Sequence, residues 1–248
     1  MLSNPRRAKF DIAHTRRALG AAIRGALPQA CVLCAAASGD ALLCDACAAD
    51  MPATAEACPQ CALPTPAGVR CGTCLAHPPP YEATIAAWRY AFPADRLLRA
   101  FKYGGRLALA EPFALALCGA VRARGSPVPD RLIALPLAPR RQRQRGFNHA
   151  HEIATRVSSI TGVALERAFR RTRDTPPQAG LTLRERARNV RHAFMAEAPL
   201  TGLSVAIVDD VMTTGATLAS AAVAARAAGA LRIEAWVVAR TPMPGQRS

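Results

Sequence analysis

The sequence has no long apolar run, and this excludes one class of protein at the outset. The apolar stretch 107–121 is interrupted by Glu111 and Pro112, so it falls short of the roughly 20 apolar residues that a membrane-spanning helix needs. Near the N-terminus, the arginine pair 16–17 precedes only the short apolar segment 18–23, which is too brief for the core of a secretory signal. We therefore expect a cytoplasmic protein without a membrane span.

Acidic residues, lysines and aromatics are also scarce. There are 17 Asp and Glu against 32 Lys and Arg, a net charge of +15, and the only lysines are Lys9 and Lys102. Residues 131–191 hold 14 arginines and 4 acids, so this segment alone carries +10. The excess of positive charge favours phosphate-rich ligands or nucleic acid. However, with aromatics at 5% no stacking platform for single-stranded nucleic acid is evident.

Cysteine, by contrast, is plentiful and regularly spaced. Eight of the nine cysteines form four C-x-x-C pairs, and each cysteine of the first two pairs recurs 27 residues later, which indicates an internal duplication. The first copy contains Cys31, Cys34, Cys44 and Cys47, and the second contains Cys58, Cys61, Cys71 and Cys74. The ninth, Cys118, lies in an apolar helical stretch and is expected in the core.

Four thiolates from two C-x-x-C turns can complete a closed tetrahedral zinc site, so we expect about two structural Zn²⁺ ions. The segment has few large apolar residues and should need metal to fold. Two alternatives are disulfides, which need an oxidising compartment, and redox pairs, which need a surrounding strand and helix pattern that is not seen here. The spacing leaves open whether each copy holds its own ion or the pairs cross-brace.

The stretch 205–218 carries the clearest functional pattern. The apolar run 203–208 predicts a buried strand that stops at two adjacent acids, Asp209 and Asp210; a hydroxyl-rich turn and an alanine-rich helix follow. A strand, a loop of small residues and a helix N-terminus together form an anion site, because free N–H groups and the helix dipole face the loop. The acids would accept hydrogen bonds from sugar hydroxyls or contact Mg²⁺. The pattern therefore indicates a phosphorylated sugar.

Residues 208–217, V-D-D-V-M-T-T-G-A-T, resemble the phosphoribosyl-pyrophosphate (PRPP) loop of type I phosphoribosyltransferases. The resemblance implies that Asp209 and Asp210 are the catalytic acids that hold the ribose hydroxyls. It also implies that the remaining loop residues bind PRPP, with the turn holding its 5′-phosphate: Val211, Met212, Thr213, Thr214, Gly215, Ala216 and Thr217. The plain alternative is a strand and helix whose acids only cap the helix.

Four further motifs together resemble the ComF family of competence-associated proteins: P-L-x-P-R at 136–140, R-G-F-N-x-A at 145–150, Q-x-x-L at 178–181 and E-R-x-x-N-V at 185–190. The resemblance implies further PRPP contacts at Pro136, Leu137, Arg140, Arg145 and Asn148. It also implies a flexible loop over the substrate with Gln178, Arg184, Arg186 and Arg188. His149 departs from the glutamine expected in R-G-F-N-Q-A, so Asn148 is the safer polar contact of this motif.

Lys102 is a lysine in a chain that otherwise chooses arginine. A compact ammonium aimed at a phosphate is one interpretation, and we include Lys102 among the candidate PRPP-binding residues. A solvated helix terminus explains the residue equally well.

Strands that alternate with helices predict a twisted parallel α/β sheet with its ligand at the carboxyl ends of the strands. Together with the resemblance, this gives a type I phosphoribosyltransferase-like fold preceded by a double zinc ribbon. The expected segments are a basic arm at 1–30, the ribbons at 31–77 and the phosphoribosyltransferase domain at 81–248.

Two functions follow from the resemblance. The first is an enzyme that transfers phosphoribosyl from PRPP, with Mg²⁺, to a nitrogen nucleophile such as a nucleobase, releasing pyrophosphate in association with DNA uptake. The second is a non-catalytic PRPP-binding adaptor that handles single-stranded DNA with other competence proteins. A redox or zinc-sensing switch rests only on the C-x-x-C pairs. The fold alone does not separate these functions.

Overall fold

The computed structural model describes residues 29–54, 56–138, 142–143, 146–172 and 193–242. The chain forms two compact units, residues 1–50 and 51–248, and the boundary falls between the two cysteine repeats. The first repeat therefore belongs to one unit, and the second belongs to the same unit as the sheet. The predicted division into an arm, a ribbon module and a domain stays a prediction.

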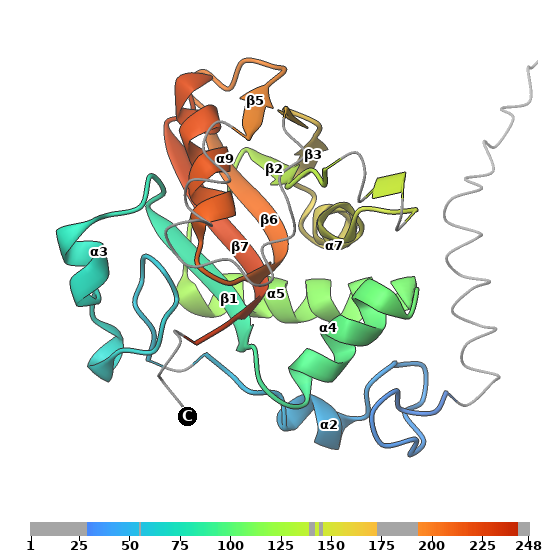
Figure 1. The fold of residues 1–248 in the computed structure, drawn as a ribbon. Helices are drawn as coiled ribbons and strands as arrows, with labels where there is room; N and C mark the ends of the chain where they lie inside the picture. Colours follow the sequence, from blue (N-terminus) through green and yellow to red (C-terminus); the bar gives the residue numbers. More distant parts are fainter. Residues whose placement is uncertain (1–28, 55, 139–141, 144–145, 173–192, 243–248) are drawn as a thin grey trace, which may run out of the picture. The chain divides into compact units, whose positions relative to one another are not determined.

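The second unit is built on a five-stranded sheet with the order β1-β7-β6-β2-β3 (Figure 1). Every neighbouring pair in it is parallel, which confirms the predicted parallel α/β architecture. The strands are β1 (Ala83–Arg89), β2 (Arg131–Ala134), β3 (Ala164–Glu166), β6 (Ser204–Met212) and β7 (Arg232–Arg240). A separate antiparallel pair is formed by β4 (Phe169–Arg171) and β5 (Phe194–Ala196).

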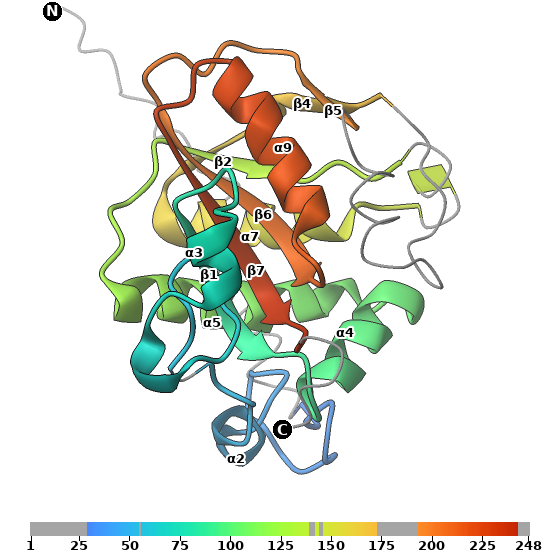
Figure 2. The same cartoon turned by 60° about the vertical axis from the view of Figure 1, so that its left-hand side comes forward.

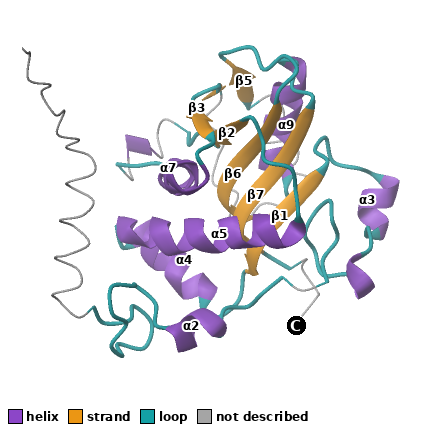
Figure 3. Cartoon of the chain, turned by 180° about the vertical axis from the view of Figure 1, so that it is seen from behind, coloured by secondary structure: helices purple, strands orange, loops and turns teal. Residues whose placement is uncertain are grey.

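Helices cover both faces of the sheet. Helices α5 (Ala110–Arg124) and α7 (His149–Thr161) lie on one face, and α9 (Ala216–Ala227) lies on the other (Figures 1 and 3). Helix α4 (Ala94–Tyr103) precedes α5, with the 3₁₀ turn η2 (Leu107–Leu109) between them. Because both faces are covered, β7 is an almost continuous apolar strand, and all of its residues after Arg232 are buried. No helix in the described parts of the chain is long and apolar enough to cross a membrane.

The central strand β6 is longer than its apolar run. The sequence predicted a strand that stops before Asp209, whereas pairing with β7 continues as far as Met212 opposite Arg240. Backbone hydrogen bonds to a long neighbouring strand keep the chain extended although the side chains change from apolar to acidic. Both acids are therefore held in regular strand geometry rather than in a loop.

Short helical turns accompany the cysteine repeats. The first unit contains α2 (Asp45–Ala49), and the second contains η1 (Pro66–Gly68) and α3 (Gly72–Ala76). The second repeat is joined to the first strand of the sheet (Figure 2). Thr84 in β1 donates its N–H to the carbonyl of Pro59 at 3.2 Å and its hydroxyl to the carbonyl of Gln60 at 2.7 Å. This repeat is thus tied directly to the sheet.

Candidate functional site

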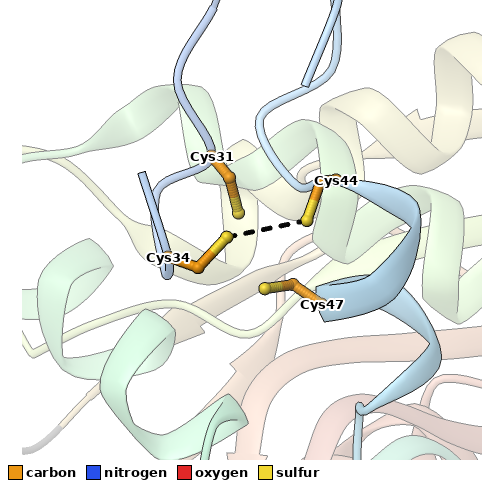
Figure 4. A group of neighbouring side chains, drawn as sticks. All are labelled: Cys31, Cys34, Cys44 and Cys47. Carbon is orange, nitrogen blue, oxygen red and sulfur yellow. Dashed lines mark hydrogen bonds between the residues drawn. The ribbon is translucent and has the colours of Figure 1, made fainter. Parts of the chain in front are cut away.

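The eight paired cysteines form two separate four-sulfur clusters, one from each repeat. Within each cluster all sulfurs lie within 4.8 Å of one another, and Figure 4 shows the first set converging from two turns. The sulfurs of Cys34 and Cys44 are 3.7 Å apart, and those of Cys61 and Cys71 are 3.6 Å apart. Tetrahedral zinc with Zn–S bonds of about 2.3 Å places its sulfurs about 3.8 Å apart, so the geometry fits one Zn²⁺ in each repeat without cross-bracing.

The two clusters differ in their surroundings. In the second, Cys58, Cys61 and Cys74 are buried and pack with Leu63, whereas in the first only Cys31 is buried and Cys34 is exposed. Burial acts against ionisation of Cys58, but backbone N–H groups outweigh it and lower the pKa of this thiol to about 7. A sulfur that ionises near neutral pH is prepared to serve as a metal ligand.

A second candidate site lies at the end of β6, where the two acids meet a lysine. Lys102 Nζ, from the last turn of α4, is 2.9 Å from Asp210 Oδ1, so Lys102 does not end in open solvent as the plain interpretation of it supposed. Burial acts to lower the pKa of Lys102, but the charge of Asp210 and the hydrogen bond to it outweigh burial and raise it. Lys102 is therefore firmly cationic.

Asp209 is electrostatically different from its neighbour. Burial, reinforced by the negative charge of Asp210, raises the pKa of Asp209 to about 7. The positive charges of Lys102 and Arg171 act in the opposite direction but do not cancel the rise. Its Oδ1 also accepts the N–H of Asp210 at 2.8 Å. The pair thus combines one carboxylate held by a lysine with one that is close to its titration point near neutral pH.

The turn after β6 leads directly into α9. Gly215 caps the helix with φ of +79°, and the hydroxyl of Thr214 accepts the N–H of Ala216 at 3.3 Å. A side chain at Gly215 would meet Met212 Cε at 2.9 Å and Tyr81 Oη at 3.1 Å. The turn therefore requires glycine both for its backbone conformation and for space. The first N–H groups of α9 follow at once, in the arrangement that binds anions.

The motif after β2 lies at the same end of the sheet, because Ala134 pairs with Val208. Pro136 and Leu137 follow that strand directly. Asn148 is the N-cap of α7: its Oδ1 accepts the N–H of Ala150 at 3.1 Å, and its Nδ2 donates to the carbonyl of Leu135 at 3.0 Å. Asn148 therefore joins the helix to the strand end. Its predicted contact with PRPP stays a prediction.

Six of the predicted PRPP contacts lie outside the described residues. Arg140 and Arg145 of the β2 motif lie outside the described residues, as do the four flexible-loop candidates Gln178, Arg184, Arg186 and Arg188. His149, which departs from the ComF pattern, is buried, and its ring makes edge-on contacts with Phe101 and Phe147 at 5.0 and 4.7 Å between centroids. It packs α7 against the helix that carries Lys102.

Sequence reasoning missed three residues near the acids and the turn: Arg171, Tyr81 and Arg240. Arg171, at the end of β4, adds positive charge beside Asp209. Tyr81 lies against Gly215, and Arg240 donates to backbone carbonyls of the turn. A signal was present for Arg240, since it is the charged residue that ends the apolar run 235–239. Nothing local in the sequence marks the other two.

An apolar groove of about 860 Å³ lies between α9 and the segment 194–199. Half of its lining residues are alanines, and the others are Phe194, Met195, Val223, two prolines and the polar residues Glu197 and Ser220. Such a lining offers few groups that could bind a phosphate. The strand, turn and helix at 209–217 remain the stronger candidate for a phosphorylated ligand.

Comparisons with known proteins agree with this arrangement. A family model described as a double zinc ribbon domain matches residues 22–75. The DNA utilization protein YhgH of Escherichia coli O157:H7 is 35% identical over 217 residues, which cover 85% of this chain and 90% of that protein. Competence protein F of Haemophilus influenzae is 30% identical over 177 residues, 68% of this chain and 77% of that protein.

Among solved structures, a purine phosphoribosyltransferase from Pyrococcus horikoshii Ot3 is similar at 21% identity and a TM-score of 0.33, covering 53% of this chain and 73% of that one. The sheet order, the cysteine clusters and the family model give the present chain a parallel α/β sheet with N-terminal double zinc ribbons. With a relative 35% identical over most of both chains, the protein belongs to the ComF family, together with YhgH and competence protein F.

Proposed function

We propose that the protein binds PRPP at residues 209–217 and, with Mg²⁺, transfers its phosphoribosyl group to a nitrogen nucleophile. One observation carries the proposal: two acids, a threonine-glycine turn and a helix N-terminus follow one another at the carboxyl end of the central strand, and Lys102 is brought to them from another helix. Each part has a partner on PRPP, because the turn suits a 5′-phosphate and the acids suit ribose hydroxyls.

The proposed binding step gives the two acids different tasks. Asp210 forms an ion pair with Lys102, and its carboxylate oxygens can accept a hydrogen bond from a ribose hydroxyl. Asp209, with its pKa near 7, gains most from a nearby cation, since positive charge favours the ionised acid. Its oxygens and those of Asp210 are the kind of ligand that Mg²⁺ prefers, so the residues fit the ion.

The proposed chemistry is substitution at C1 of the ribose. The bond from C1 to the pyrophosphate oxygen breaks, and pyrophosphate leaves with the electron pair. The bond from C1 to the acceptor nitrogen forms, and the nitrogen loses a proton to solvent. Bound Mg²⁺ would stabilise the charge that develops on the leaving group. The chain itself would hold C1 in position and place Lys102 and Arg171 close to the developing negative charge.

The names of the relatives suggest where such a reaction would serve. YhgH is named for DNA utilization and competence protein F for competence. Degradation of DNA releases nucleotides, and cleavage of their glycosidic bonds frees nucleobases. Transfer of phosphoribosyl to a ring nitrogen turns such a base into a nucleotide again. A nucleobase-type acceptor is therefore the substrate we propose, in a protein that acts in the use of DNA.

A second candidate is a PRPP-binding adaptor for single-stranded DNA that performs no transfer. The observation in its favour is the charge of +10 carried by residues 131–191, because clustered arginines bind phosphate backbones without reading sequence. The same names, DNA utilization and competence, fit this role equally well.

Calorimetric titration with PRPP and Mg²⁺, followed by a pyrophosphate-release assay over a panel of nucleobases, tests the main proposal. Binding should weaken at least about tenfold in Asp210→Asn and in Lys102→Met, and release should depend on one class of base. Arg226→Lys, in the last turn of α9, is the matched control because Arg226 contacts Glu82 and two carbonyls outside this site. Absence of PRPP binding in the wild type would refute the proposal.

DNA binding over a salt series separates the two candidates. In the double variant Arg184→Ala and Arg186→Ala, the enzyme proposal expects slower pyrophosphate release with DNA affinity nearly intact. The adaptor expects weaker DNA binding and a salt slope smaller by about one unit for each arginine lost. PRPP binding without release for any base, together with that loss of DNA affinity, would establish the adaptor in place of the enzyme.

A further inference from the structure

Arg240 joins the second cysteine cluster to the turn proposed to bind phosphate. It is the last residue of β7 and is only 4% exposed. Its Nε donates to the carbonyl of Cys61, a member of the cluster, at 2.8 Å. Its Nη1 donates to the carbonyl of Met212 at 3.1 Å and to that of Thr213. One guanidinium thus holds a cluster residue and the start of the turn in a fixed relation.

The charge of Arg240 needs compensation, because a buried cation without a counter-charge is costly. Among the described residues, the ion pairs found do not include Arg240. The ionisable groups whose charge acts on it include Cys61, Cys71 and Cys74. Four thiolates around one Zn²⁺ carry a net charge of −2. The metal-loaded second cluster would therefore supply a counter-charge that no acidic ion-pair partner provides within the part of the chain that the structure describes.

A second physical link runs through Tyr81. Its phenol oxygen lies 3.1 Å from where a side chain on Gly215 would begin. Its backbone carbonyl accepts the side-chain amide of Gln60 at 3.2 Å, and Gln60 sits between the cluster members Cys58 and Cys61. Ala62, which follows the cluster turn, packs in the same core as Tyr81 and Met212. The second cluster is therefore linked to the turn through Gln60 and Tyr81 as well as through Arg240.

We propose that the second zinc cluster, acting through Arg240, is a positioning element of the PRPP site. Metal in this cluster fixes the carbonyls of Met212 and Thr213 and so fixes the N–H groups that follow them. The effect on PRPP affinity rests on the function proposed above, whereas the effect on the geometry of the turn does not. The first cluster, with the same ligands and spacing, belongs to the other compact unit, and the proposal assigns it no such role.

The duplication provides a matched pair of variants. Cys34→Ser and Cys61→Ser change equivalent positions of the two repeats, and each should reduce the metal content from two ions to one. In Cys61→Ser, PRPP affinity should fall at least about tenfold, and the amides of residues 212–217 should exchange faster with deuterium. In Cys34→Ser, neither should change. Equal effects of the two variants, or none at 212–217, would overturn the proposal.

Substitution of the arginine tests the same link with both metals in place. Arg240→Lys keeps the charge, but one ammonium cannot reproduce the two separate nitrogens that bridge Cys61 to the turn. It should retain two zinc ions and still show faster exchange at 212–217 and about tenfold weaker PRPP binding. Arg226→Lys is the control. Unchanged exchange in Arg240→Lys would refute the inference even if Cys61→Ser fails to fold.

The two proposals fail in different ways. If the wild type binds no PRPP, the proposed function is wrong, while the exchange measurement still decides whether the cluster positions the turn. If PRPP binds and Arg240→Lys matches the wild type in both affinity and exchange, the function stands and the positioning role is wrong.

Discussion

Replacement of Gly215 by alanine tests the turn with the smallest possible perturbation. The residue has φ of +79°, and an added Cβ would meet Met212 Cε at 2.9 Å and Tyr81 Oη at 3.1 Å. The methionine end can move aside, but Tyr81 is buried and packed in the core, so it can yield only by disturbing its neighbours. The change should therefore strain the turn and push it away from Tyr81.

The magnitude follows from two terms with a partial offset. Positive φ costs an L-residue about 1–2 kcal/mol, and overpacking of the contact costs about 1–3 kcal/mol. Alanine restricts the unfolded chain, which returns about 0.4–1 kcal/mol. Gly125 provides the control, since its φ is +65° and a Cβ there meets nothing within 4 Å. The cost of positive φ and the restriction of the unfolded chain apply to both variants, so Gly215→Ala should destabilise the unit by about 1–3 kcal/mol more than Gly125→Ala.

Thermal unfolding of the two variants, followed by PRPP titration, measures both consequences. Both glycines lie in the unit 51–248, so the same transition is compared. The extra loss corresponds to a Tm lower by about 2–12 °C for Gly215→Ala than for Gly125→Ala. PRPP affinity should fall only in Gly215→Ala. Equal Tm values and equal affinities for the two variants would show that the space beside Tyr81 is not restrictive and that the turn does not bind the ligand.

Three further predictions concern the metals, the turn after β6 and Asp209. Elemental analysis should find about two zinc ions per chain; none, with all eight paired thiols freely titratable, would contradict the clusters. Thr214→Val should weaken PRPP binding at least about tenfold without unfolding the chain, and an unchanged titration would exclude the turn as the phosphate site. Asp209, with a folded pKa of about 7 against about 4 unfolded, binds extra protons in the native state between these values. Stability should therefore fall as pH rises through this window, and Asp209→Asn should remove that decline in Tm measured from pH 5 to 8; an unchanged decline would refute this assignment.

Local pattern was enough to predict much of the fold. The apolar runs that became β6 and β7 are long and bounded by turn residues, and the alanine-rich segment that became α9 has high helix propensity, so period and propensity agree there. The end of β6 was misplaced because strand pairing extends through Asp209 to Met212. Hydrogen bonds with a distant strand decide that boundary, and they leave no trace in local hydrophobicity.

The candidate site was predictable from sequence only where its residues are contiguous in the chain. Asp209, Asp210 and the turn are contiguous, so one motif contains them. Lys102 was ambiguous in the sequence, since only the packing of α4 brings its ammonium to 2.9 Å from Asp210. Arg171 lies in β4 and acts on Asp209, and Tyr81 lies just before β1 and meets Gly215. No spacing rule in the sequence connects such distant segments. Contacts of this kind depend on how the strands and helices are arranged in space, and local sequence patterns do not reveal that arrangement.

The two cysteine repeats show that ligand spacing predicts a metal site but not what the site does in the fold. Their ligand spacing is identical, and in both repeats the four sulfurs lie within 4.8 Å of one another, so the two four-sulfur sites were predictable from sequence. Their roles were not, because the neighbours differ: the second repeat gives the carbonyl of Cys61 to a buried arginine and that of Gln60 to β1. A metal stiffens whatever its ligands' backbone touches. In our proposal, zinc in the first repeat would stabilise that repeat alone. Zinc in the second repeat would also, through Arg240, position the proposed ligand site.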